Sequence, residues 1–137
     1  MQQRDYLMRQ IEQMSKVLVA LIRKLLGLKS VDLEEETIHS TNEVLQEQLN
    51  TSIDEILATP LKEVAEFITQ LNGLDISNLE LFADILVLNA KVYSDKTHQK
   101  KLFETGLELY NWADEKSSTF SMERQMKIRD VKNSLIQ

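Results

Sequence analysis

Few residues in this sequence have a type and spacing that could do chemistry, and the best spaced are an acid and a histidine. Glu36 and His39 form the Glu-x-x-His pattern with which carboxylate-bridged di-iron bundles bind metal. Asp95 and His98 repeat this spacing loosely. Such a site needs ligands that converge inside a bundle. Because Glu36 and His39 lie on the side of their helix opposite Ile38, we expect both to face solvent and predict no metal site.

Nucleophilic and phosphate-binding chemistry also lacks its usual residues. The chain has no cysteine, which excludes a cysteine nucleophile, a thiolate zinc site and a disulfide framework. The two histidines are far apart, no serine is flanked by glycines, and the three glycines are isolated. We therefore predict a protein that is not an enzyme and binds no cofactor and no small-molecule ligand. An enzyme with an unrecognised carboxylate site stays open as an alternative.

The charge of the chain is unevenly distributed. The formal net charge is −6, which argues against nucleic acid as a partner because phosphate binding needs a basic surface. Residues 1–30 carry six basic and two acidic side chains, whereas residues 31–137 carry ten basic and twenty acidic ones. The first thirty residues are therefore a basic segment attached to an acidic body.

The elements that must position these residues are predicted to be helices. The chain has one proline and three glycines, too few for the turns of an all-β protein, and its 137 residues suit one domain spanning 1–137. Apolar periodicity and capping residues predict an all-α fold of six or seven helices, arranged as a helical-hairpin stack or an irregular bundle. The predicted helices cover residues 4–26, 33–50, 53–58, 60–71, 78–94, 97–116 and 122–137.

The predicted helix over residues 78–94 is apolar around nearly its whole circumference, so we expect it at the centre of the domain. Ser77 and Glu80 have the spacing of a capping box at its start. Asn89 falls on the same face as Phe82 and Leu86, which predicts a buried amide. We interpret Asn89 as a structural hydrogen-bonding residue between helices, with a ligand contact as the alternative.

The predicted first helix carries the strongest candidate for a functional surface. Residues 1–28 form an amphipathic segment, and Gly27 stands where a left-handed C-cap would end the helix. Its apolar side chains follow heptad spacing over three heptads. The interaction residues that this spacing predicts are Leu7, Ile11, Met14, Leu18, Leu21 and Leu25. The seam either packs within the chain or projects as an association element, with a protein partner or a second copy.

Trp112 is the second candidate for an interaction residue. It lies on the side of the 97–116 helix that faces away from Gly106 and Tyr110. Two interpretations remain open: Trp112 packs on a second neighbouring helix, or it is an exposed aromatic side chain of the kind that anchors interfaces.

The sequence predicts no membrane span, no signal peptide and a cytoplasmic location. The longest charge-free apolar stretch covers only residues 17–22, and Arg23 and Lys24 interrupt it. A peripheral attachment to a membrane surface is weaker but open, since Arg9 and Lys16 also make the polar side of the first helix basic.

Two resemblances support the helical interpretation. Gly106, Tyr110 and Ala113 are spaced like the small and aromatic residues in the second helix of a tetratricopeptide repeat, over residues 79–117. Segments 4–13, 25–28 and 119–124 resemble recurring segments of an uncharacterised bacterial family, a domain of unknown function with tetratricopeptide-like helical hairpins. That resemblance implies an all-helical fold and supplies no activity. We therefore expect a non-enzymatic protein-interaction module whose first helix mediates oligomerisation or partner docking.

Overall fold

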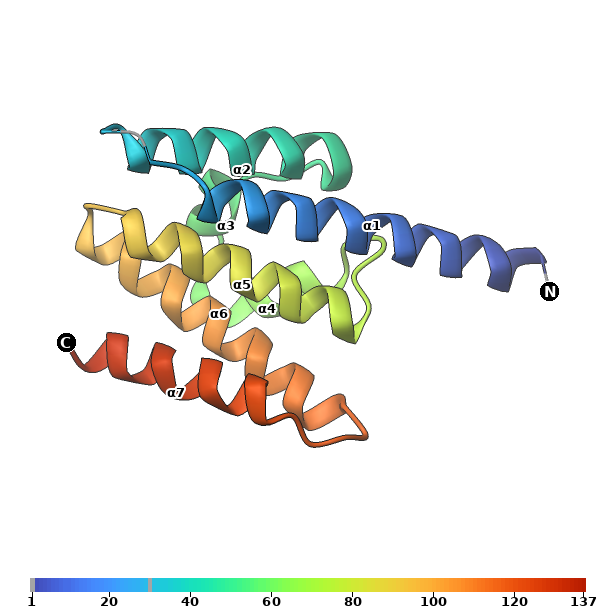
Figure 1. Cartoon of the computed structure of the whole chain (residues 1–137). Coiled ribbons are helices and arrows are strands. Elements are labelled where there is room, and N and C mark those ends of the chain that lie inside the picture. Colours follow the sequence, from blue (N-terminus) through green and yellow to red (C-terminus); the bar gives the residue numbers. More distant parts are fainter. Residues whose placement is uncertain (1, 30) are drawn as a thin grey trace.

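The computed structural model describes residues 2–29 and 31–137, and throughout this part of the chain the regular structure is helical (Figure 1). The prediction of an all-α fold with six or seven helices and a central fifth helix is confirmed. The described helices are α1 (Gln2–Leu26), α2 (Leu33–Leu49), α3 (Ile53–Ala58), α4 (Leu61–Thr69), α5 (Ile76–Val92), α6 (Lys96–Lys116) and α7 (Met122–Ile136).

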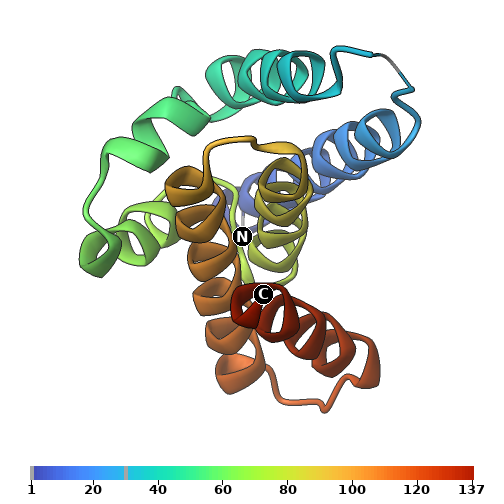
Figure 2. The same cartoon turned by 90° about the vertical axis from the view of Figure 1, so that its left-hand side faces the viewer.

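The long helices lie roughly side by side. Helices α1, α5 and α7 run in one direction, and α2 and α6 run in the opposite one (Figure 1). Helix α5 contacts α1, α2 and α6, whereas α7 packs on α6. The short helices α3 and α4 connect α2 to α5, and they lie against α6 on a different side from α7 (Figure 2). Helix α7 and the carboxyl half of α1 therefore flank α5 from different sides.

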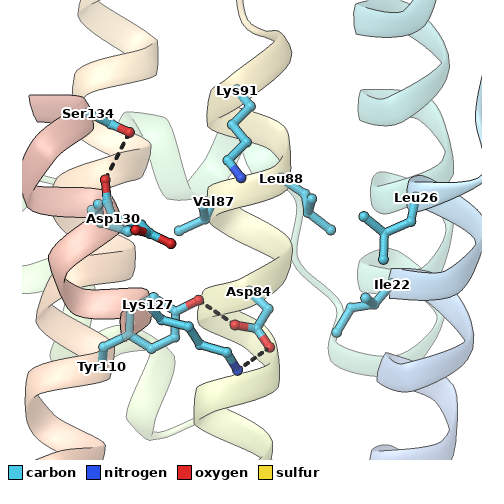
Figure 3. Close-up of a pocket in the computed structure, with 11 residues that line it drawn as sticks. Ile22, Leu26, Asp84, Val87, Leu88, Lys91, Tyr110, Lys127, Asp130 and Ser134 are labelled. Atoms are coloured by element: carbon cyan, nitrogen blue, oxygen red, sulfur yellow. Dashed lines mark hydrogen bonds and ion pairs between the residues drawn. The ribbon is translucent and has the colours of Figure 1, made fainter. Parts of the chain in front are cut away.

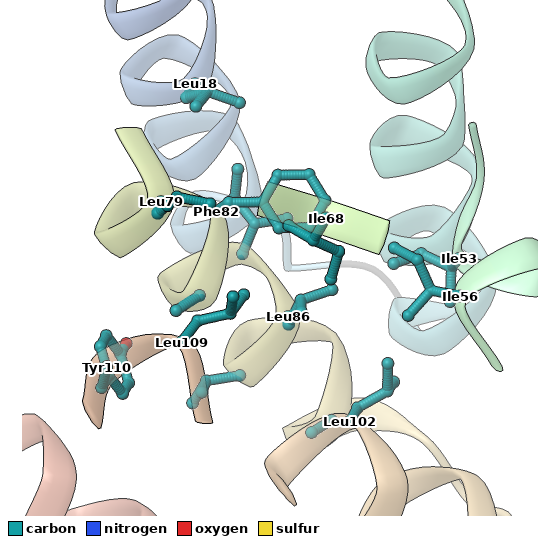
Figure 4. Close-up of a cluster of buried hydrophobic side chains, with 14 of the residues drawn as sticks. Leu18, Ile53, Ile56, Ile68, Leu79, Phe82, Leu86, Leu102, Leu109 and Tyr110 are labelled. Atoms are coloured by element: carbon teal, nitrogen blue, oxygen red, sulfur yellow. The ribbon is translucent and has the colours of Figure 1, made fainter. Parts of the chain in front are cut away.

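Helix α5 is central because its apolar side chains point in several directions. Leu79, Phe82 and Leu86 are fully or almost fully buried. Figure 4 shows them meeting Leu18 of α1 and Leu109 of α6 in one cluster. This core takes buried side chains from every one of the described helices. Burial of apolar surface on several sides is what a helix without a wide polar face requires.

Several helices begin at residues whose side chains cap them, and one helix begins two residues earlier than predicted. Ser52 and Ser121 cap α3 and α7 by accepting hydrogen bonds from the backbone N–H groups of Glu55 and Arg124. The predicted cap Ser77 is wrong, since α5 begins two residues earlier and the Asp75 carboxylate accepts from the N–H of Asn78 at 3.0 Å. Asp95 caps α6 in the same way, which places His98 in the first turn of α6.

The left-handed conformation predicted for one glycine is adopted by another. Gly27 does not adopt the left-handed conformation predicted for it, and its N–H continues the helical hydrogen bonds to Arg23 and Lys24. The positive φ of 86° belongs instead to Gly73, in the turn before α5. An L residue rarely adopts this conformation, so Gly73 permits the turn.

No helix in the described part of the chain is both long and apolar enough to cross a lipid bilayer.

Candidate functional site

Helix α1 has a packed half and a projecting half. The predicted interaction residues Met14, Leu18, Leu21 and Leu25 are buried in the core of the same chain. The first turns of α1 extend beyond the other helices, as Figure 1 shows at the N-terminal end. Leu7, at the beginning of the predicted seam, is 55% exposed. The seam is thus divided between the protein's own core and a surface open to a partner.

The boundary between the two halves is marked by a hydrogen bond. The side-chain amide of Asn78, which is itself buried, donates to the backbone carbonyl of Ile11 at 3.0 Å and to that of Gly73 at 2.8 Å. This amide ties α1 to the turn that precedes α5. Ile11, the remaining seam residue before Met14, is half-buried at this boundary.

We define the arm as residues 3–10, which precede this tether. Its side chains are exposed from position 3 to position 9, and that includes large apolar groups. Tyr6 is 68% exposed and Met8 53% exposed, beside Leu7. Exposed apolar groups that lie together are typical of interaction surfaces. Arg4 and Arg9 place positive charge on the same arm.

A second apolar stripe continues from the arm along the outer side of α1. We define the outer stripe as the residues spaced 7, 4, 3 and 4 positions apart, which share one side of an α-helix: Met8, Ser15, Val19, Ile22 and Leu26. Leu26 is 66% exposed, and Ser15, Val19 and Ile22 are half-buried. The outer stripe is therefore only partly covered by the protein's own helices.

The last two residues of the outer stripe, Ile22 and Leu26, form one wall of a groove. The groove has a volume of about 350 Å³, with α5 as its floor and α7 as its far wall (Figure 3). Its apolar lining comes from Ile22, Leu26, Val87, Leu88 and Val131. Its polar lining comes from Asp84, Lys91, Tyr110, Lys127, Asp130 and Ser134.

Asp84 is a half-buried carboxylate in this groove. It accepts hydrogen bonds from the phenol of Tyr110 and from the ammonium of Lys127, the latter at 3.1 Å (Figure 3). Burial raises the pKa of Asp84 above its ordinary value, and the bond from Tyr110 and the charge of Lys127 offset this only in part. Burial also raises the pKa of Tyr110, and the Asp84 charge raises it further.

Lys127 and Arg124 of α7 extend this cluster into a network. Burial by itself would lower the pKa of Lys127, but the carboxylates of Asp84 and Glu80 raise it. Glu80 lies 3.2 Å from Lys127 and 3.2 Å from the almost fully buried Arg124. Arg124 also binds Asp114 of α6 at 3.0 Å. We define the clamp as these six residues, which join α5, α6 and α7: Glu80, Asp84, Tyr110, Asp114, Arg124 and Lys127.

The clamp limits the chemistry that Asp84 can do. A general base needs an oxygen lone pair within reach of the proton that it takes, and each hydrogen bond that a carboxylate accepts uses one of its four. One oxygen of Asp84 already accepts from Tyr110 and the other from Lys127. The arrangement is suited to holding three helices together, with each buried charge facing an opposite one.

The predicted buried amide is confirmed as a structural contact. Asn89 is fully buried, and its side-chain nitrogen donates to the hydroxyl of Thr41 at 3.0 Å and to the carbonyl of Ile85 at 2.9 Å. The first of these bonds joins α5 to α2. Trp112 is half-buried and packs against the core cluster, and its assignment as an interaction residue stays a prediction.

The Glu-x-x-His segment faces solvent as expected. The side chain of His39 is 75% exposed, with Glu43 at 3.6 Å as a neighbour on the same helix. His98 lies 3.9 Å from Asp95 at the start of α6. Among residues 2–29 and 31–137, no group of three or more histidine, aspartate or glutamate side chains could hold a metal ion.

The clamp is the feature that sequence reasoning missed. Glu80 and Asp84 form a polar strip on an otherwise apolar helix, and Arg124 lies four and seven positions before the buried Ile128 and Val131. A charged residue aligned with buried positions is a signal that it has an opposite charge to bind. From that signal one could have predicted an ion pair between α5 and α7.

Comparison of the chain with protein-family models, with curated proteins and with solved structures finds no match. The resemblance to an uncharacterised bacterial family therefore stays a prediction.

Proposed function

We propose that this chain is a non-enzymatic helical interaction module that self-associates through α1. The observation that supports the proposal is the arm, in which Tyr6, Leu7 and Met8 are exposed on a helix that extends beyond its own core. A helical segment of this length is marginal in water when no neighbour covers its apolar side chains. A second copy of α1 offers such a neighbour.

The apolar surface of the arm is large enough to matter energetically. Full burial of one leucine or methionine side chain contributes about 1.5–3 kcal/mol. In a symmetric dimer the two copies of Met8 are both buried, because both chains contribute the same residue. Their combined gain can therefore offset much of the entropy that association costs.

The experiment compares two double variants by sedimentation velocity. Leu7→Glu with Met8→Glu places two charges on the arm, whereas Gln46→Glu with Gln48→Glu places the same two charges on the exposed side of α2. We expect the unaltered chain and the α2 variant to sediment at twice the 15.9 kDa chain mass, and the arm variant at that mass. A monomeric unaltered chain, or an arm variant that still dimerises, contradicts the proposal.

A second candidate function is attachment to an acidic membrane surface, which the arm also favours. Arg4 and Arg9 lie on the arm beside its exposed Tyr6, a combination typical of interfacial helices. Co-sedimentation with vesicles containing anionic lipid at low salt tests this function, and loss of binding in the Leu7→Glu, Met8→Glu variant would assign it to the arm. We further propose a cytoplasmic location, because a chain without cysteine suits a reducing compartment.

A further inference from the structure

The outer stripe suggests how two copies of α1 meet. It begins with Met8 on the arm and ends with Leu26 at the groove, so a surface that needs a partner runs nearly the whole length of α1. Ser15 is the small residue at its middle. Two helices approach most closely where the side chains between them are small.

An antiparallel arrangement centred on Ser15 brings apolar residues together. If Ser15 of one copy faces Ser15 of the other, position n faces position 30 − n. Met8 then faces Ile22, and the half-buried Ile11 faces Val19. Each arm therefore covers the outer stripe of the other copy where that stripe borders the groove.

The charges beside the outer stripe favour the same antiparallel direction. Asp5, Arg9 and Glu12 flank its first half, and Lys16 and Arg23 flank its second half, all exposed. Antiparallel pairing places acidic residues of one copy beside basic residues of the other. Glu12 then lies near Lys16 of the second copy, and Asp5 lies near Arg23 of the second copy.

The groove offers further charge complementarity to the arm. Arg4 would face Leu26, at the wall of a groove whose other wall carries Asp130. The aliphatic stem of an arginine covers apolar surface while its guanidinium reaches a polar group beyond. The arm thus brings apolar groups to the α1 side of the groove and a positive charge toward Asp130 on the α7 wall, which also carries Lys127.

We propose that a second copy of this chain occupies the groove wall, with the two α1 helices antiparallel, a two-fold axis at Ser15 and each arm on the other copy's Ile22 and Leu26. This inference rests on the proposed self-association and adds its register and its binding surface. The interface is isologous, so it closes as a dimer and leaves no free copy of the arm.

Disulfide trapping tests the register, since the chain has no cysteine of its own. Ser15→Cys places two thiols on the proposed axis, whereas Gln13→Cys places an exposed thiol elsewhere on the same helix. Under mild oxidation we expect Ser15→Cys to form a covalent dimer at least about tenfold faster than Gln13→Cys. Equal rates overturn the inference.

A charge exchange gives an independent test that leaves the core untouched. Asp5→Arg should weaken the dimer about two- to tenfold, and adding Arg23→Asp should restore it. A double variant that is no tighter than Asp5→Arg overturns the antiparallel register.

These outcomes separate the inference from the proposed function. If the arm variant loses dimerisation but neither the trapping nor the charge exchange behaves as expected, α1 mediates association in another geometry and only the inference fails. If the unaltered chain is a monomer at every concentration, both fail.

Discussion

Arg124 shows how a single charge can be held inside this protein. Its side chain is almost fully buried, and it donates to Asp114, to Glu80 and to the backbone carbonyl of Thr119. A buried charge that loses its partner is costly, whereas a matched set of charges is tolerated. The consequence of removing Arg124 therefore depends on the carboxylates that it leaves behind.

We expect Arg124→Met to lower the free energy of unfolding by about 2–3 kcal/mol, less than for a fully buried pair because Glu80 and Asp114 keep some contact with water. Urea denaturation measures the change. Arg129→Met is the matched control at an exposed position of the same helix, where we expect a change within about 0.5 kcal/mol. Equal effects of the two substitutions would show that the clamp does not stabilise the fold.

Tyr110 makes the fold sensitive to alkaline pH. Its pKa in the folded chain lies above the ordinary value of 10.0, so above pH 10.0 the unfolded chain releases the phenolic proton and the folded chain keeps it. Lys127 acts with the same sign above its ordinary 10.5. Because the unfolded state then binds fewer protons than the folded state, stability falls as pH rises.

Tyr110→Phe removes one of these two contributions. We expect its free energy of unfolding to fall less steeply with pH above 10.0, by up to about 1.4 kcal/mol per pH unit. Urea titrations at several alkaline pH values measure both slopes. Identical slopes for the two proteins would contradict the role assigned to Tyr110.

At the scale of elements, α5 and α6 are held closer than their sequences suggest. A Cβ atom on Gly106 would lie 2.9 Å from a methyl carbon of Val87 and 3.5 Å from the carbonyl of Ala83. The first distance is too short for two carbon atoms. Gly106 is therefore required by the neighbouring helix rather than by the conformation of its own backbone.

Gly106→Ala should reverse the usual effect of this substitution. In a helix interior it normally stabilises by about 1 kcal/mol, but here overpacking costs about 1–3 kcal/mol, so we expect a net loss. In a Val87→Ala background, where the methyl is gone, the same change should be stabilising. Thermal unfolding of the four proteins of this cycle measures both effects, and the same sign in both backgrounds would contradict the packing argument.

Helix positions could be predicted from the sequence because apolar spacing and capping residues are local signals. The start of α5 was displaced for a reason that is not local. The side-chain amide of Asn78 donates a hydrogen bond to the backbone carbonyl of Ile11 on α1. Its backbone N–H donates to the carboxylate of Asp75, the residue that caps α5 in place of Ser77. Both Asp75 and Ser77 are good capping residues, so the sequence alone does not choose between them.

At the scale of the whole molecule, the candidate surface on α1 could be predicted but its extent could not. Heptad spacing does not distinguish Leu7 from Leu18, although one is exposed and the other is in the core. That difference depends on where α5 begins beside α1. The clamp could not be assembled for the same kind of reason, because Asp84 and Lys127 meet only through the packing of helices far apart in the sequence.

If the dimer forms, the stability of the whole chain depends on its own concentration. Association stabilises the folded state by mass action, so the Tm of the unaltered chain should rise as the protein concentration rises. The Tm of the Leu7→Glu, Met8→Glu variant should not. Differential scanning calorimetry at several concentrations measures both, and parallel curves would show that the arm does not couple association to folding.

The hydrogen bond from Asn78 to Ile11 divides α1 into two regions, which we expect to differ in how readily their helical hydrogen bonds open. Backbone amides near Leu18 exchange their hydrogens with water only when the core opens. Amides of residues 3–10 need only local fraying, which costs little in a helix end without neighbours. Their exchange would slow when a second copy covers them. In the proposed dimer, hydrogen exchange at the two ends of α1 would therefore report two different events: the folding of the chain near Leu18 and the binding of a second copy at residues 3–10.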